Sequence, residues 1–105
     1  MSTYERSLAA LGDPTRRAVF ELLRDGPRSV GELAARLPVS RPAVSQHLRV
    51  LKEAGAVRDR AVGARRLYSV SPQAVGELRA YFDSFWDTAL SGFVSAVEKE
   101  RKGSG

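Results

Sequence analysis

The sequence predicts a mainly α-helical domain with one small β-hairpin, in the order of four helices, two strands and a long last helix. Three observations lead to this prediction. Apolar residues recur at helical spacing in five segments, they alternate between residues 56 and 70, and Ser, Asp, Pro or Gly stands at the boundaries. With 105 residues the chain can bury one core, so we expect one domain over residues 1–98 and a flexible tail over residues 99–105.

The first two helices are expected to be short. Ser2 or Thr3 caps the first helix, and Gly12 ends it. The pair Asp13-Pro14 then starts a second helix, which runs to about Arg24. Both helices carry apolar residues on one side and therefore face a shared core.

Two further helices are joined by a tight turn. Ser29 and Glu32 have the spacing of a capping box, so a short third helix is expected to begin there and to stop before Pro38. Ser40 can cap the fourth helix. Two helices separated by so few residues predict a helix-turn-helix at about residues 29–54, in which the second helix can lie in the major groove of DNA.

The fourth helix has an apolar face and a basic, polar face. At roughly 100° per residue, Val44, Leu48 and Leu51 point toward the core. The other arc is suited to reading base edges and contacting phosphates, and it holds Arg41, Pro42, Ser45, Gln46, Arg49, Lys52 and Glu53. A solvated helix face is the alternative interpretation when this run is taken alone.

Residues 56–70 are expected to form the β-hairpin, with Gly63-Ala64 as its turn. Several arginines cluster on this hairpin: Arg58, Arg60, Arg65 and Arg66. Basic residues on exposed strands can simply discourage edge-to-edge pairing. Beside a helix-turn-helix, however, an arginine-rich hairpin is better explained as a wing that contacts phosphates or the minor groove.

The net charge of +5 is concentrated in the middle of the chain. Residues 28–66 contain nine Lys or Arg and three Asp or Glu, whereas the remainder contains eight basic and nine acidic residues. A localised basic surface is typical of a protein with a polyanionic partner, and here the partner expected is double-stranded DNA.

The last helix is expected to begin at Ser71-Pro72 and to continue to about Glu98, a length of about 40 Å at 1.5 Å per residue. A domain of this size cannot cover so long an aromatic-rich stripe, so we expect a second copy to cover it in a two-fold dimer. The alternative is a helix folded entirely onto its own domain. The interface is predicted to contain Tyr4, Leu8, Leu11, Phe82, Phe85, Trp86, Ala89 and Phe93.

The composition excludes several kinds of chemistry. The chain has no cysteine, so it has no disulfide, thiolate nucleophile or thiolate metal site, and no metal or cofactor is predicted. It has no membrane-length apolar run and no signal peptide, so we expect a soluble, cytoplasmic protein without a membrane partner. It lacks a phosphate-binding glycine loop, and the lone His47 has no evident carboxylate partner, so an enzyme is not predicted.

Four motifs together carry a family resemblance: residues 11–16 (LGDPTR), 29–34 (SVGELA), 40–48 (SRPAVSQHL) and 51–55 (LKEAG). Over about residues 4–98 the chain resembles the ArsR/SmtB family of bacterial winged helix-turn-helix repressors. The resemblance implies a homodimer that binds an imperfect palindrome upstream of its own operon and blocks transcription. It also implies major-groove contacts from Arg41, Pro42, Ser45, Gln46 and Arg49, and wing contacts from Arg65 and Arg66.

His47 stands where the family often has a histidine, but the helical wheel places it inside the apolar arc. We therefore expect a partly buried, hydrogen-bonded packing residue, for which a phosphate contact is the alternative. The predicted DNA-binding set is completed by His47, Ser40 and Arg60.

The sequence departs from well-known family members in its sensor. The third helix reads VGELAA over residues 30–35, without a Cys-x-Cys pair, and the last helix has no histidine. Soft-metal ligation needs thiolate or imidazole donors, so the chain looks most like the metal-independent branch related to sporulation-delay autorepressors. A small apolar effector could bind beside Phe82, Phe85 and Trp86, although these rings can equally serve only as core or dimer contacts.

Two function classes follow from these patterns. The first is a sequence-specific DNA-binding regulator, most simply a homodimeric repressor. The second is a protein-interaction module that uses the same scaffold and presents the aromatic last helix, since a fold does not determine a function. The basic face of the fourth helix favours the first class, because an interaction module gains nothing from it.

Overall fold

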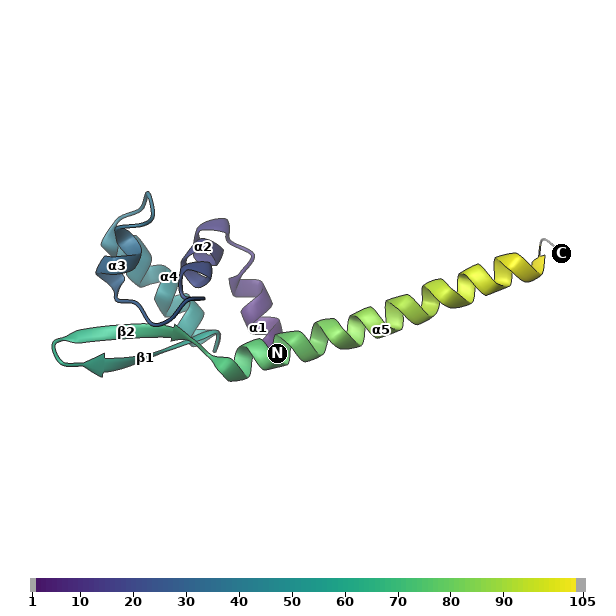
Figure 1. The fold of residues 1–105 in the computed structure, drawn as a ribbon. Helices are drawn as coiled ribbons and strands as arrows, with labels where there is room; N and C mark the ends of the chain where they lie inside the picture. The colour runs from purple at the N-terminus through teal and green to yellow at the C-terminus, as the bar shows by residue number, and fades with distance from the viewer. Residues whose placement is uncertain (1, 104–105) are drawn as a thin grey trace.

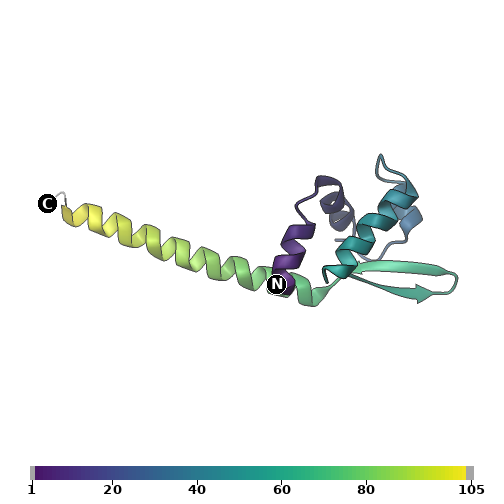
Figure 2. The same cartoon turned by 180° about the vertical axis from the view of Figure 1, so that it is seen from behind.

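The chain forms a small head and one long helix that leaves it (Figure 1). The computed structural model describes residues 2–103 and measures 71 × 26 × 25 Å. The elongation comes from the last helix, which two opposite views show as a rod beyond the head (Figure 1, Figure 2). The elements are α1 (Thr3–Ala10), α2 (Pro14–Leu22), α3 (Val30–Ala34), α4 (Arg41–Glu53), β1 (Val57–Val62), β2 (Arg65–Val70) and α5 (Pro72–Gly103).

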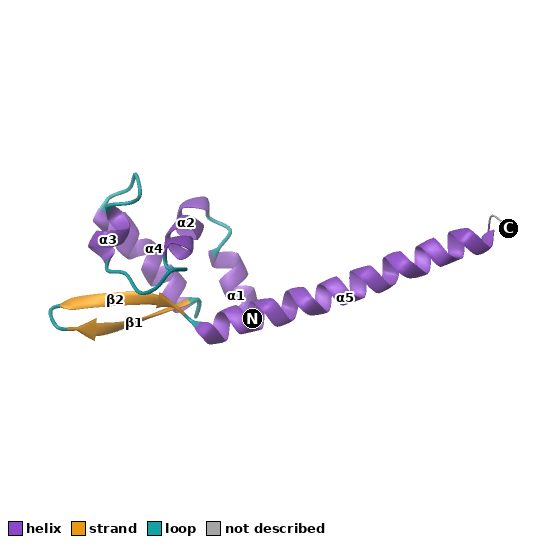
Figure 3. Cartoon of the chain, viewed as in Figure 1, coloured by secondary structure: helices purple, strands orange, loops and turns teal. Residues whose placement is uncertain are grey.

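This order of elements confirms the predicted fold class (Figure 3). Each of the first four helices begins after a side chain that accepts a hydrogen bond from a backbone amide of the first turn. Ser29 and Glu32 form the complete capping box. The caps are Ser2, Asp13, Ser29 and Ser40, with oxygen-to-nitrogen distances of 3.4, 2.9, 3.2 and 3.3 Å.

Three helix ends differ from the prediction. α3 stops at Ala34 rather than just before Pro38, because the chain turns from its C-cap Ala35 onward. α2 stops at Leu22 rather than near Arg24, because the chain already turns toward Gly26, whose φ is 137°. α5 continues past Glu98 to Gly103, so residues 99–103, predicted as part of a flexible tail, are helical. Positions 99–102 are Lys, Glu or Arg, which favour a helix. The last two residues of the predicted tail lie outside the described residues.

The core lies in the head and is built around α4. Val44, Leu48 and Leu51 are completely buried, as the helical spacing predicts. Burying a side chain of this size contributes about 1.5–3 kcal/mol, so one face of α4 is firmly fixed and the opposite face stays outside. The buried apolar partners from the other elements are Ala10, Val19, Leu23, Leu33, Ala56 and Val57.

The hairpin forms the wing, and it is joined to the head along one edge. Its strands pair antiparallel with Val57 opposite Val70, and the two-residue turn at Gly63-Ala64 has a positive φ of 61° at the glycine. On the other side of β2, Arg28 and Tyr68 exchange two backbone hydrogen bonds of 2.9 and 2.8 Å. The segment that leads into α3 therefore continues the sheet and fixes the wing beside the helix-turn-helix.

Two arginines of α2 close the end of α1. Arg16 Nη1 donates to the carbonyl of Ala10 at 3.0 Å, and Arg17 Nη1 donates to the carbonyl of Leu11 at 3.2 Å. The last carbonyls of a helix have no partner within the helix, so these contacts satisfy two of them. The corner between α1 and α2 is thus held by side chains as well as by the cap at Asp13.

Only the beginning of α5 contacts the head. Ala74 is buried there, and the ring of Tyr81 stacks on Tyr4 of α1 with the centroids 4.7 Å apart. Farther along, the large side chains are open: Phe82, Phe85, Trp86 and Phe93 are 52–66% exposed. A last helix folded entirely onto its own domain is therefore not what the chain adopts.

Candidate DNA-binding surface

Nine of the ten residues predicted to bind DNA are exposed, and the tenth, His47, is half-buried. They lie on two neighbouring parts of the head, the outer face of α4 and the hairpin, which Figure 2 shows next to each other. The exposed set consists of Ser40, Arg41, Pro42, Ser45, Gln46, Arg49, Arg60, Arg65 and Arg66. The structure therefore leaves nine of the predicted residues accessible, on α4 and on the hairpin that contacts it.

The start of α4 is packed closely against α3. A Cβ atom added to Gly31 would lie 3.1 Å from Nη2 of Arg41 and 3.3 Å from its Cζ, so the guanidinium rests on the glycine. A larger residue at this position would displace it. Sequence reasoning assigned Gly31 only to the third helix, because the contact depends on how two helices cross.

The middle of the exposed face of α4 carries Ser45, Gln46 and Arg49. Arg49 pairs with Glu53 one turn later, at 3.6 Å, and both side chains are 70% exposed. An exposed pair of this kind contributes little to stability, so a phosphate or a base edge can replace Glu53 at small cost. Arg49 thus stays available to DNA.

An acidic residue of the wing, Asp59, holds two of the basic residues. Its Oδ1 lies 2.8 Å from Nζ of Lys52 on α4, and its Oδ2 lies 2.8 Å from Nη1 of Arg66 on β2. The hydrogen bond from Lys52, and then the one from Arg66, holds the pKa of Asp59 below its usual value. Asp59 therefore stays ionised and links the wing to the end of α4.

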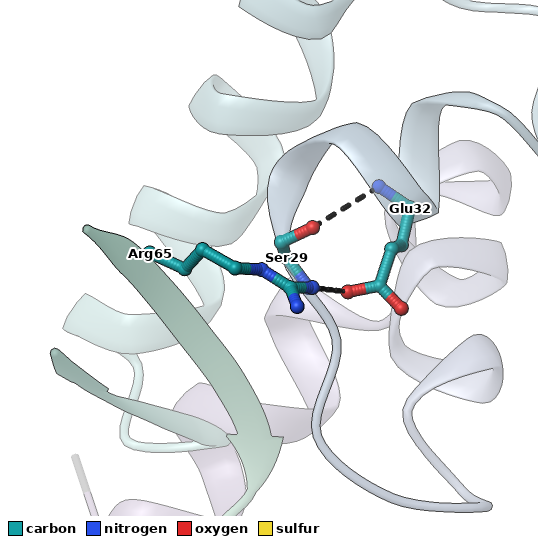
Figure 4. Close-up of polar contacts among 3 residues, drawn as sticks. All are labelled: Ser29, Glu32 and Arg65. Atoms are coloured by element: carbon teal, nitrogen blue, oxygen red, sulfur yellow. Dashed lines mark hydrogen bonds and ion pairs between the residues drawn. The ribbon is translucent and has the colours of Figure 1, made fainter. Parts of the chain in front are cut away.

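A second acidic residue holds the wing near its turn. Glu32 of α3 accepts a hydrogen bond from Nη2 of Arg65 and also closes the capping box with Ser29 (Figure 4). The backbone amide of Ser29, followed by its hydroxyl, lowers the pKa of Glu32, and the charge of Arg65 lowers it further. Arg65 is thus directed toward α3 in the absence of DNA.

These ion pairs were not predicted. The sequence predicts DNA contacts for Arg65 and Arg66 and no role for Asp59. The sequence carries one signal of a partner for Asp59. Asp59 lies two residues after Val57, whose side chain is buried, so both side chains face inward from the hairpin. An acid on the inward face of a basic hairpin needs a partner of opposite charge. The identity of that partner depends on the fold and could not be found from spacing.

His47 lies where the helical wheel places it, half-buried on the inner side of α4. Its Nδ1 is buried but forms no hydrogen bond with any described residue, so the hydrogen bond expected for this ring is not seen at that atom.

Two other features are absent from the part of the chain that the structure describes. Among residues 2–103, no three His, Asp or Glu side chains come together in a group that could hold a metal ion. No helix in the same range is both long and apolar enough to cross a membrane. The rings of Phe82, Phe85 and Trp86, considered above either as effector contacts or as core and dimer contacts, lie open on α5.

Comparisons with known proteins agree with this geometry. A family model described as a helix-turn-helix domain matches residues 11–60. The chain is 52% identical over 103 residues to the HTH-type transcriptional regulator Rv2034 of Mycobacterium tuberculosis (strain ATCC 25618 / H37Rv), and the match covers 95% of this chain and 96% of that protein.

Solved structures give the same result. An ArsR-like transcriptional regulator from Rhodococcus sp. RHA1 is 30% identical with a TM-score of 0.71, covering 87% of this chain and 89% of that one. A homodimeric winged helix-turn-helix DNA-binding domain from Mycobacterium bovis, described as a possible ArsR-family transcriptional regulator, is 28% identical with a TM-score of 0.66, covering 86% and 83%.

Two of these proteins are named transcriptional regulators and the third is described as a possible one, in agreement with the prediction of a regulator rather than an enzyme. The identity extends over nearly the whole length, and the head has the helix-turn-helix and the wing that the motifs predict. The chain belongs to the ArsR/SmtB family of winged helix-turn-helix transcriptional regulators.

Proposed function

We propose that this regulator is a homodimeric repressor that binds an imperfect palindrome in double-stranded DNA upstream of its own operon. The observation that carries the proposal is the orientation of α4. Its apolar face is anchored by Val44, Leu48 and Leu51, so its basic face points outward from a rigid support. A helix held in this way beside a basic wing is suited to enter the major groove.

The proposed division of roles follows the exposure of the side chains. Arg41, Ser45, Gln46 and Arg49 contact base edges, and Ser40 and Pro42 lie at the start of the same helix. His47 contacts phosphate at most, because its ring is half-buried. Arg60, Arg65 and Arg66 of the wing contact the backbone, which positions the head without reading sequence.

The exposed stripe of α5 supports the homodimer. At roughly 100° per residue, Phe82, Trp86 and Phe93 fall on one side of the helix, and mainly polar residues, among them Ser84, Ser91 and Glu98, fall on the other. A second copy of the stripe covers the aromatic side in the dimer. In our proposal the interface contains Phe82, Phe85, Trp86, Ala89 and Phe93, and Tyr4, Leu8 and Leu11 support it from α1.

We also propose that this regulator does not sense metal through thiolates and that it belongs to the sporulation-delay branch of the family. The chain has no cysteine, and its one histidine lies half-buried on α4. If a small apolar molecule acts as effector, the open rings of Phe82, Phe85 and Trp86 are its proposed contacts, enclosed only once two chains pair.

The test is a titration of the purified protein against its own upstream DNA and a shuffled duplex of equal length, at near-physiological salt. We expect a preference of about a thousandfold for the upstream DNA, with two chains bound to each palindrome. Equal and steeply salt-dependent binding to both duplexes would contradict the proposal, because it would show only attraction of a basic surface to phosphate.

Two matched arginine variants assign the base-reading face. Arg49 and Arg79 are both exposed and both pair with an acid one turn later, but Arg79 lies on α5. Arg49→Ala should weaken binding to the upstream DNA by about 1–3 kcal/mol and binding to the shuffled duplex far less. Arg79→Ala should leave both affinities unchanged. Equal losses on both duplexes for Arg49→Ala would remove Arg49 from base reading.

A further inference from the structure

We propose that Asp59 is a positioning residue that sets the angle of the wing against the recognition helix, and that specific DNA binding depends on it. The inference rests on the proposed function, since it concerns how the two DNA-contacting elements are held together. Asp59 itself does not contact DNA in this proposal. It acts through Lys52 on α4 and Arg66 on β2.

The geometry of the carboxylate carries the argument. Each of its two oxygens has one basic partner at 2.8 Å, Lys52 for Oδ1 and Arg66 for Oδ2. The side chain of Asp59 is 8% exposed, whereas those of Lys52 and Arg66 are 54% and 55% exposed. The anion therefore lies inside, and its cations extend past it toward the outer surface.

This contact adds a side-chain link between α4 and the wing to the backbone bridge of Arg28 and Tyr68. The last turn of α4 leads into Gly55, whose φ is 83°, and the wing is a two-stranded hairpin, which is marginally stable by itself. The pair between Glu32 and Arg65, nearer the turn of the hairpin, is more exposed, with its side chains 43% and 59% exposed. A nearly buried carboxylate with a basic partner on each oxygen constrains the angle between α4 and the wing better than an exposed ion pair does.

A simple electrostatic view gives the opposite expectation. Asp59 is one of only three acidic residues between positions 28 and 66, so removing its charge makes the DNA-facing side more positive. If charge alone mattered, Asp59→Asn would bind every DNA duplex more tightly. If Asp59 positions the wing, the variant binds specific DNA more weakly although the net positive charge has risen.

The experiment compares three variants of the full chain on two duplexes. One duplex is selected by the wild-type protein from a random-sequence pool, and the other is its shuffled counterpart. Asp59→Asn removes the charge, and Asp59→Glu keeps the charge but lengthens the side chain. Asp25→Asn is the control, because it removes the same charge from an exposed turn of the head.

We expect Asp59→Asn to lose at least tenfold in affinity for the selected duplex while its affinity for the shuffled duplex stays equal or rises. Asp59→Glu should also lose specificity, since a carboxylate moved by one methylene cannot keep both partners at their present distance. Asp25→Asn should change both affinities slightly and equally. Far-UV circular dichroism and thermal unfolding identify any variant that does not fold, and Asp59→Glu then decides the question.

Two results would overturn the inference. In one, Asp59→Asn behaves like Asp25→Asn on both duplexes, and in the other, Asp59→Glu keeps the wild-type preference. Failure of the proposed function looks different, because the wild-type protein would then enrich no sequence from the pool. The two ideas can thus fail separately.

Discussion

The head and α5 differ in how their apolar side chains are covered. In the head, Leu33, Leu48 and Leu51 come from two helices and are completely buried. In α5, Leu90, Phe93 and Val94 are 45–66% exposed although they are equally apolar. The head is complete as a single chain, whereas most of α5 extends beyond the head without a partner in that chain (Figure 1).

The difference shows how chain topology decides burial. Tight corners after α1, α2, α3 and α4 bring short helices back onto each other, so each covers the apolar face of the next. α5 has 32 residues and no corner, so most of it extends beyond everything that could cover it. Apolar residues recur along the helices of both regions, but only the head buries them in a core without a second molecule.

The largest expected effect comes from truncating the same residue type in both regions. Leu48→Ala should reduce the free energy of unfolding by about 2–5 kcal/mol at every protein concentration, because it leaves a cavity in the core of the head. Stability of a small domain is about 5–15 kcal/mol in total, so this variant loses a large share of it. The measurement is urea unfolding followed by circular dichroism at two protein concentrations.

Leu90→Ala is the counterpart in α5. In a dilute single chain it should have almost no effect, since Leu90 is 45% exposed and alanine favours a helix. At concentrations where chains pair, it should cost about 1–3 kcal/mol per chain, because the side chain is then buried by the partner. An effect of Leu90→Ala that is the same at both concentrations would contradict the contrast between the two regions.

The head and α5 also differ in how well the sequence predicts their structure. Caps, turn residues and helical spacing are local, so the four helix starts in the head, the apolar face of α4 and the turn at Gly63 follow from the sequence. The end of α5 was placed five residues too early, because charged residues favour a helix as readily as a tail.

The candidate site was less predictable than the fold. The spacing along α4 identifies Ser45, Gln46 and Arg49 as exposed residues because one helix determines its own faces. The pairing of Asp59 with Lys52 and Arg66 was beyond reach, since it requires the crossing of a helix and a hairpin. The wing arginines therefore have structural partners that composition and charge could not reveal.

A smaller effect is expected on the stability of the head at low pH. The head holds Asp13, whose pKa is lowered first by the backbone amide of Arg16. A lowered pKa in the folded state adds stability above the unfolded value of 3.8, and this stability is lost as the pH falls through the folded pKa. We expect the head to lose stability below about pH 4, as thermal unfolding measured against pH would show.

Asp13→Asn separates the cap from the charge. Asparagine caps a helix as well as aspartate does, so stability at neutral pH should change little, while the loss in acid should become shallower. Asp13→Ala is the control, since it removes the cap and should lower stability at neutral pH as well. An Asp13→Asn variant with the unchanged acid profile would show that other carboxylates of the head dominate the response.

The smallest expected effect uses two glycines of α5. Gly76 and Gly92 both lie inside the helix, and a Cβ added at either would meet nothing within 4 Å. In a dilute single chain, Gly76→Ala and Gly92→Ala should each raise helix stability by about 0.5–1 kcal/mol, measured by thermal unfolding. At roughly 100° per residue, Gly92 lies next to Phe85 at the edge of the aromatic stripe, so a paired chain approaches it closely. The gain at Gly92 should therefore shrink at high protein concentration while the gain at Gly76 remains, and equal gains at both concentrations would place the partner on another side of α5.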